Sequence, residues 1–281
     1  MPVTRSGLRQ FTVIPSRGRL AGIIAGVGTQ ACFALTVVSL FSYLRYGVPE
    51  STPSWLLVDS FLALQFAIPH SIILHPATRK ALRPWISPEF YGLFFCLCTC
   101  LSLQWIFACW RSSPILIWDL EGIPARLMLA GFYASWVALL YSISLTGLGY
   151  QTGLSQWLYW IRGENMPRRD FTPKSLYRWM RHPVYLSFLG LIWFTPTMSA
   201  DHAVLTGIWT VYIAIGSILK DQRLLFYLGD PYARYMQQVT GYPLMLIGPL
   251  AKHAALCPAP ERTVSAATTP SMVRSETQKA A

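Results

Sequence analysis

The chain has 281 residues, of which 53% are hydrophobic and only 12% charged, and 23 basic against 12 acidic residues give a net charge of +11. A soluble domain usually has about a quarter of its residues charged, so this composition excludes an ordinary soluble protein. The hydrocarbon core of a bilayer, ~30 Å thick, needs about 20 apolar residues per helical span, and several stretches of that length occur. The basic residues lie in short segments between them, which favours contact with anionic lipid headgroups over nucleic acid.

The N-terminal half predicts four membrane helices. Residues 1–19 form a basic arm, and the uncharged run that follows is too long to be the apolar core of a signal peptide. The predicted spans cover residues 20–44, 55–74, 91–110 and 127–150. Segment 20–150 is therefore expected to be a bundle of four helices in an all-α integral membrane protein with about six membrane helices.

The C-terminal half predicts a helical hairpin. Its apolar stretches, 183–198 and 203–219, are short for full spans, since the first would rise only roughly 24 Å as a helix. We expect a tight hairpin whose tip, with Asp201 and His202, reaches the far interface. The hairpin belongs to a region, 151–249, that is expected to carry the chemistry.

Two segments follow the hairpin. Residues after Leu219 place leucines and a tyrosine at helical spacing, which predicts an amphipathic surface helix broken near Gly229 and Pro231. Residues 250–281 are rich in Ala, Thr, Ser and Pro and are predicted to be a disordered tail.

The distribution of basic residues predicts the orientation of the chain. If the amino terminus lies in the cytoplasm, only Arg45, Arg111 and Arg126 face the other side. The positive-inside rule favours that arrangement, with both termini and the mouth of the hairpin in the cytoplasm. A bacterial inner membrane is the expected location.

Arg181 and His182 stand directly before Pro183, where a helix is predicted to begin. Proline suits the first helical turn, and a helix N-terminus offers unpaired amide donors and a partial positive charge. Two basic side chains are unfavourable there unless an anion binds, such as the carboxylate of an amino-acid-like cofactor. The alternative for Arg181 is a membrane-interface anchor whose side chain extends to the headgroups.

The predicted hairpin returns the chain to the same interface. Asp221 should therefore lie near Arg181 and His182, where it could pair with Arg181 or with the ammonium or ribose hydroxyls of a cofactor. Tyr232 and Tyr235 could close over this mouth with aromatic faces that attract a cation such as a sulfonium.

His70 is a second candidate, because a polar side chain inside a predicted span is costly and often functional. The alternative is a structural hydrogen bond to Gln65 or Ser71. His75 is the nearest histidine in the sequence, and the pair lacks a third ligand, so no metal site is expected.

Several motifs resemble the membrane-embedded methyltransferases that include isoprenylcysteine carboxyl methyltransferase and phospholipid methyltransferases. The similarity is greatest to the branch of bacterial methanethiol S-methyltransferases and NnrU-like proteins, and it covers about residues 55–249. The motifs are RHPVY at 181–185, the acid Asp221, LGDPYARY at 228–235, the run from Phe171 to His202, AIPHS at 67–71 and GLSQWLYW at 153–160.

The resemblance implies an S-adenosylmethionine-dependent methyltransferase that holds its cofactor on the cytosolic side and methylates a small apolar acceptor, most plausibly a thiol. The cofactor-binding residues that it implies are Arg181, His182, Pro183, Tyr185, Asp221, Tyr232 and Tyr235. Arg181, His182 and His70 are the candidate catalytic residues. Two alternatives stay open, a non-catalytic NnrU-like accessory protein and a sterol-type membrane reductase.

The chain departs from this family at three places. Lys220 and Asp221 stand where relatives carry two glutamates, Ser187 replaces a glycine, and Pro69 replaces a glutamine. If the site still binds S-adenosylmethionine, Lys220 is expected to turn away toward water or headgroups, as its long stem permits.

Overall fold

The computed structural model describes residues 16–48, 55–167 and 171–253. Within these ranges, five helices are long and apolar enough to cross a membrane. They are α1 (Ser16–Tyr46), α2 (Trp55–Leu74), α4 (Tyr91–Cys109), α5 (Gly122–Thr146) and α9 (Ala200–Leu228). These helices confirm the predicted all-α membrane class. Apolar stretches of this length form helices because a helix satisfies its backbone hydrogen bonds internally.

The expected sixth membrane helix is shorter than predicted. Helix α8 (Pro183–Trp193) is apolar but ends before Pro196, which has no backbone N–H to continue a helix. The residues that follow form strand β2 (Thr197–Ser199), which pairs antiparallel with β1 (Leu116–Asp119). The tip of the hairpin is thus a small two-stranded sheet.

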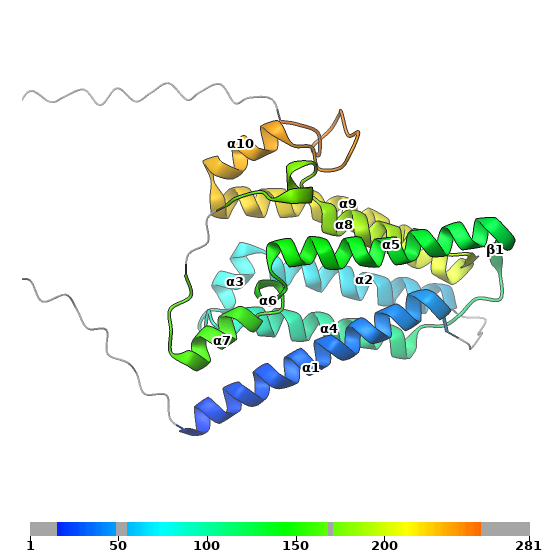
Figure 1. Cartoon of the computed structure of the whole chain (residues 1–281). Helices are drawn as coiled ribbons and strands as arrows, with labels where there is room; N and C mark the ends of the chain where they lie inside the picture. Colours follow the sequence, from blue (N-terminus) through cyan, green and yellow to red (C-terminus); the bar gives the residue numbers. More distant parts are fainter. Residues whose placement is uncertain (1–15, 49–54, 168–170, 254–281) are drawn as a thin grey trace, which may run out of the picture.

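The helices form a bundle with two distinct ends (Figure 1). Helix α1 begins and α9 ends at the same end, here called the α10 end, while β1 and β2 lie at the opposite strand end. The short elements of the α10 end are α3 (Pro76–Leu82), α6 (Leu148–Gln151), α7 (Leu154–Arg162), the 3₁₀ helix η1 (Ser175–Arg178) and α10 (Asp230–Gln238).

The core runs between α1, α2, α4, α5, α8 and α9. Its fully buried side chains include Phe132, Leu191 and Leu205, while apolar residues such as Leu57 and Ile24 face outward, with exposed fractions of 83% and 63%. In water such a surface would be unfavourable. It fits a bundle whose outer face is in contact with lipid.

The tip of the hairpin lies at the strand end, opposite the α10 end, and one predicted boundary of the hairpin is wrong. Asp201 is buried at the start of α9, where it accepts hydrogen bonds from Trp110 Nε1 at 3.0 Å and the Ser113 amide at 2.9 Å. At the other end of α9 the helix does not stop at Leu219 but continues to Leu228, because Leu224 and Leu228 pack against α10. The break predicted near Gly229 is confirmed, with Gly229 at φ +61° between the two helices.

The expected disordered tail begins with buried residues. Leu250 and Ala251 are 5% and 7% exposed, and the Gly241 amide donates to the Leu250 carbonyl at 2.7 Å. These residues are held because they cover the segment that follows α10. Residues 254–281, the rest of the expected tail, and residues 1–15, most of the basic arm, lie outside the described residues.

Candidate active site

Arg181 and His182 are fixed by an extended backbone pairing. The Arg181 amide donates to the Thr240 carbonyl at 2.9 Å, and the His182 amide donates to the Gly241 carbonyl at 3.1 Å. A Cβ at Gly241 would lie 3.0 Å from Leu250 and 3.3 Å from the His182 ring, so glycine permits this close approach. Pro183 then starts α8, as predicted.

The side chain of Arg181 is buried in an ion pair with Asp221. Its Nη2 lies 2.9 Å from Asp221 Oδ2, and its Nε donates to the same oxygen at 3.0 Å. Nη1 donates to the carbonyls of Val239 at 2.6 Å and Ala251 at 3.2 Å. With its side chain fully buried, Arg181 does not extend to headgroups, which excludes the anchor alternative.

Asp221 is surrounded by protein groups. Besides the contact with Arg181, its Oδ1 lies 3.2 Å from His182 Nε2 and accepts a hydrogen bond from the Tyr232 hydroxyl. Helix α9 thus brings Asp221 to the start of α8, where the hairpin prediction placed it. A buried carboxylate with this many partners is held in one orientation.

Helix α10 closes the cluster from outside. Tyr232 is 1% exposed, and the Tyr235 hydroxyl donates to the Tyr177 carbonyl while its ring lies 5.6 Å from that of Tyr232. Tyr235 therefore lies beside Tyr232, and no hydrogen bond among the described residues joins it to the ion pair. Burial, with the charge of Asp221 adding to it, raises the pKa of Tyr232, so its hydroxyl keeps its proton and donates.

Both ring nitrogens of His182 are buried without a hydrogen-bond partner among the described residues, although Nε2 lies 3.2 Å from Asp221 Oδ1. The ring stacks on Tyr185, with centroids 5.6 Å apart and planes 13° apart, and Tyr242 lies 5.7 Å from it. Burial lowers the pKa of His182, an effect that Asp221 opposes, and the neutral imidazole is favoured.

Lys220 does not turn away, contrary to the expectation. Its Nζ lies 4.9 Å from the centroid of the Tyr185 ring, and within the described part of the chain it forms no ion pair. The aromatic face lies within reach of the lysine stem, and a cation–π contact stabilises the ammonium there. The site therefore contains a cation, the Lys220 ammonium, that forms no ion pair with a carboxylate of the described residues.

His70 lies apart from this cluster. Its Nδ1 is 3.3 Å from the hydroxyl of Thr99, whereas Gln65 bonds to Ser102, so neither predicted partner is the one observed. Its ring packs near Tyr212 of α9, with centroids 6.2 Å apart. Across the described residues, no hydrogen bond, ion pair or ring contact joins His70 to Arg181 or His182.

Sequence reasoning missed Tyr242. Its ring contacts His182, and its hydroxyl lies 2.6 Å from that of Ser217 on α9. Burial is the largest influence on this phenol and raises the pKa of Tyr242 to about 12. The only signal in the sequence was the aromatic residue after Gly241, in a stretch without the periodicity of a helix.

No family model matches the chain, and no solved structure matches it. Among curated proteins, a methanethiol S-methyltransferase of a Pseudomonas species is 30% identical, over 85% of this chain and 94% of its own length. The methanethiol S-methyltransferase of Mycobacterium tuberculosis is 30% identical over 66% and 76% of the two chains. Nurim of Rattus norvegicus is 25% identical over 68% of this chain and 80% of its own length.

The match to the Pseudomonas protein covers most of this chain and nearly all of that protein. The buried cluster at the start of α8 lies in the same C-terminal part of the chain whose motifs first indicated a membrane methyltransferase. By sequence similarity over nearly the full length of a relative, the chain belongs to the family of membrane-embedded methyltransferases that contains the methanethiol S-methyltransferases.

Proposed function

We propose that this protein transfers a methyl group from S-adenosylmethionine to a small thiol at the α10 end of the bundle. The observation that carries the proposal is the buried cluster of Arg181, His182 and Asp221 at the α10 end of the bundle. A polar cluster with an unpartnered ring nitrogen at that depth is costly unless a ligand completes it.

The chemistry of the side chains fits such a cofactor. S-adenosylmethionine carries a carboxylate and a sulfonium, and the unpaired ammonium of Lys220 fits the first. The ring of Tyr242, which contacts His182, fits the second. In this proposal Lys220 is a cofactor-binding residue, although relatives of the wider family carry an acid there.

The remaining candidate residues form the walls of the site. Arg181 and Asp221 balance each other's charge, so we assign to them the role of holding His182 in place. Pro183 sets the start of α8, and Tyr232 and Tyr235 cover the ion pair from α10. His70 contacts Tyr212, and we assign it a positioning role on the acceptor side.

His182 is the proposed general base. When Nε2, which lies 3.2 Å from Asp221 Oδ1, carries the proton of a neutral imidazole, Nδ1 presents a lone pair. Nδ1 would accept the proton of the thiol, which leaves the thiolate as the nucleophile for methyl transfer. The bound cofactor supplies the electrophilic methyl group.

The test combines binding and turnover on the full chain in detergent. Wild type should bind S-adenosylhomocysteine in isothermal titration and convert methanethiol to dimethyl sulfide, measured by gas chromatography. His182→Gln should lower kcat by roughly 10²- to 10⁴-fold with little change in S-adenosylhomocysteine affinity. His202→Asn at the strand end, where His202 contacts the Ile192 carbonyl, is the control and should keep activity.

Two results would overturn the proposal. Absence of S-adenosylhomocysteine binding, under conditions where a methanethiol S-methyltransferase binds it, would favour a non-catalytic accessory protein. Binding without methylation of methanethiol or larger thiols would retain the cofactor site and reject the thiol acceptor.

We also propose that both termini lie in the cytoplasm of a bacterial cell and that the bundle crosses the inner membrane. The start of α1 and the end of α9 share one end of the bundle (Figure 1). Most basic residues of the described chain lie at that end, whereas Arg45, Arg111 and Arg126 lie toward the strand end. The positive-inside rule then assigns the α10 end to the cytoplasm.

A further inference from the structure

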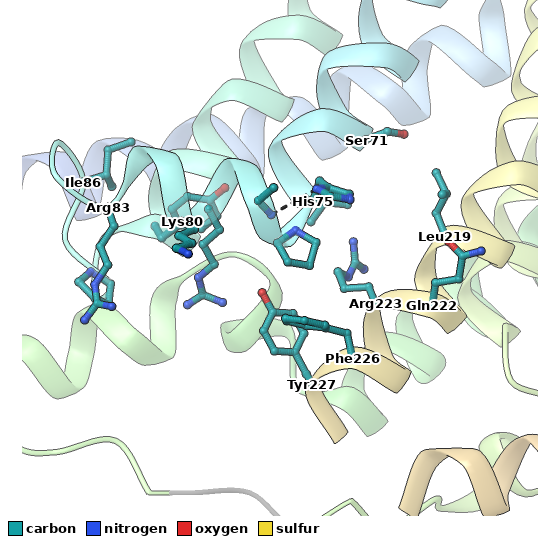
Figure 2. A pocket seen from close by; sticks show the side chains of 16 residues that line it. Ser71, His75, Lys80, Arg83, Ile86, Leu219, Gln222, Arg223, Phe226 and Tyr227 are labelled. Carbon is teal, nitrogen blue, oxygen red and sulfur yellow. Dashed lines mark hydrogen bonds between the residues drawn. The ribbon is translucent and has the colours of Figure 1, made fainter. Parts of the chain in front are cut away.

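A cavity of about 770 Å³ lies between α3, the start of α4 and the end of α9 (Figure 2). Four basic residues line it, three on or directly after α3 and one on α9. They are Arg79, Lys80, Arg83 and Arg223. Arg223 extends from α9 toward the start of α3, where His75 lies, so cations from two helices meet in one hollow (Figure 2).

The charge of this cavity is not neutralised by the protein. No Asp or Glu is among its lining residues, and within the described chain none of the four cations forms an ion pair. Arg79 packs on the face of Tyr91, with its guanidinium carbon 5.2 Å from the ring centroid. Four like charges around a concave surface repel one another and raise the local concentration of anions.

The cavity is distinct from the proposed methyl-transfer cluster. Its lining includes none of Arg181, His182 and Asp221. On α9 the cavity is lined by Leu219, Gln222, Arg223, Phe226 and Tyr227, whereas Asp221 faces Arg181. The inference below therefore does not depend on the proposed function.

The position of the cavity indicates where an anion bound in it would come from. It lies where α2 and α9 leave the apolar part of the bundle, and apolar side chains such as Leu219, Ile86 and Phe226 complete its lining. Phe226 is 70% exposed beside the cations. Phosphate oxygens suit the arginines, and acyl chains suit the apolar side chains next to them.

We propose that this cavity binds the phosphate group of an anionic membrane lipid. Arg79 and Arg83 hold the phosphate from α3, and Arg223 holds it from α9, which ties the end of α9 to α3. The lipid thereby fixes the end of the helix that also carries Lys220 and Asp221. The occupant is a phospholipid with a net negative headgroup, such as phosphatidylglycerol.

The experiment uses the full chain in detergent and native mass spectrometry with phosphatidylglycerol or phosphatidylcholine added. Wild type should retain phosphatidylglycerol in preference to phosphatidylcholine. Arg79→Gln, Arg83→Gln and Arg223→Gln should each weaken that retention about fivefold, the effect of one cation near a membrane surface. Arg162→Gln removes an equal charge from the exposed end of α7 and should change nothing.

Equal retention of the two lipids, or equal effects of Arg162→Gln and Arg83→Gln, would overturn the proposal. Binding of inorganic phosphate or glycerol phosphate that phosphatidylglycerol does not displace would assign the cavity to a free phosphate compound instead. Displacement of S-adenosylhomocysteine by phosphatidylglycerol would make the cavity part of the cofactor site. If Arg223→Gln does not fold, as judged by gel filtration, the exposed Arg83 alone decides the outcome.

Discussion

Arg181 and Asp221, forty positions apart in the sequence, form a buried ion pair in which Nη2 lies 2.9 Å from Oδ2. The pair joins the start of α8 to the end of α9 and leaves neither charge in contact with water. The pair also contacts His182, whose Nε2 lies 3.2 Å from Oδ1, the other carboxylate oxygen of Asp221. The stability of the pair and the chemistry of the site can therefore be tested separately.

Asp221→Asn should destabilise the protein by roughly 3–5 kcal/mol, because a buried guanidinium loses its partner charge. Tyr232→Phe removes one hydrogen bond to the same carboxylate and should cost less, about 1.5 kcal/mol. The double variant Arg181→Met with Asp221→Leu should recover stability but not methyl transfer, because His182 loses the carboxylate that holds it. Thermal unfolding of all variants in one detergent measures these differences, and Asp221→Asn with the stability of wild type would contradict the model of a buried pair.

The pH dependence of stability should report on His182. Its pKa is lowered in the folded protein by burial, with Lys220 and Arg181 acting in the same direction and Asp221 opposing. A histidine whose folded pKa lies below its unfolded value of ~6.5 contributes stability above that pH, which is lost as the pH falls. The melting temperature should therefore drop below about pH 6.5, and His182→Gln should flatten this drop.

The matched control is His253→Gln, at an exposed position where the imidazole contacts only the Pro249 carbonyl. It should leave the pH dependence of wild type unchanged. If His182→Gln and wild type lose stability in parallel as the pH falls, other groups are responsible, and His182 is not held in its neutral form by burial.

The membrane bundle could be predicted from the sequence because hydropathy over about 20 residues has few structural interpretations. The meeting of Asp221 with Arg181 followed from the return of the hairpin to its starting side. The end of α9 could not be predicted, since Leu224 and Leu228 fit both a separate surface helix and a continuation of α9. Their packing on α10 favours the continuous helix. The early end of α8 could not be predicted either, because a proline such as Pro196 can belong to a membrane span or to a turn.

The charged residues and three of the tyrosines that meet at the candidate site were named from the sequence, but the backbone partners of Arg181 were not. Val239 and Ala251 bind Arg181 through backbone carbonyls, which every residue has, so no residue type marks them. Lys220 was predicted to face outward because a flexible lysine usually reaches water. In the structure the Lys220 side chain lies instead over the ring of Tyr185, in the first turn of α8. This contact depends on how α8 packs on α9, which the sequence does not show.

Lys220→Met should weaken S-adenosylhomocysteine binding by roughly 10- to 150-fold, the loss of one charge-assisted hydrogen bond of about 1.5–3 kcal/mol. Lys220→Arg should retain most of the affinity, and Lys220→Glu should bind worse than Lys220→Met because it repels a carboxylate. Lys174→Met, at an exposed position before η1, is the control. Equal or better binding by Lys220→Glu in isothermal titration would show that the ammonium does not face the cofactor.

The orientation of the bundle can be tested with a reporter enzyme that is active only in the periplasm. Fused after Ala281, it should give no signal, because both termini are assigned to the cytoplasm by the basic residues of the α10 end. Fused to a chain truncated after Leu120, which follows β1 at the strand end, it should be active. The reverse pattern of signals would place the α10 end, and the proposed site, outside the cytoplasm.

Gly153→Ala should test whether the GLSQWLYW segment needs a glycine at its first position. Gly153 precedes α7 at φ +77°, and a Cβ there would lie 2.2 Å from the Leu93 amide and 2.4 Å from the Gly92 carbonyl carbon. Both neighbours are backbone atoms that no rotamer change can move, so we expect a loss of roughly 2–4 kcal/mol in unfolding free energy. Gly163→Ala, at φ +68° with open space around its Cβ, isolates the backbone strain and should cost only about 1 kcal/mol. Thermal unfolding in the same detergent compares the two, and equal losses would show that α7 is not packed this closely on α4.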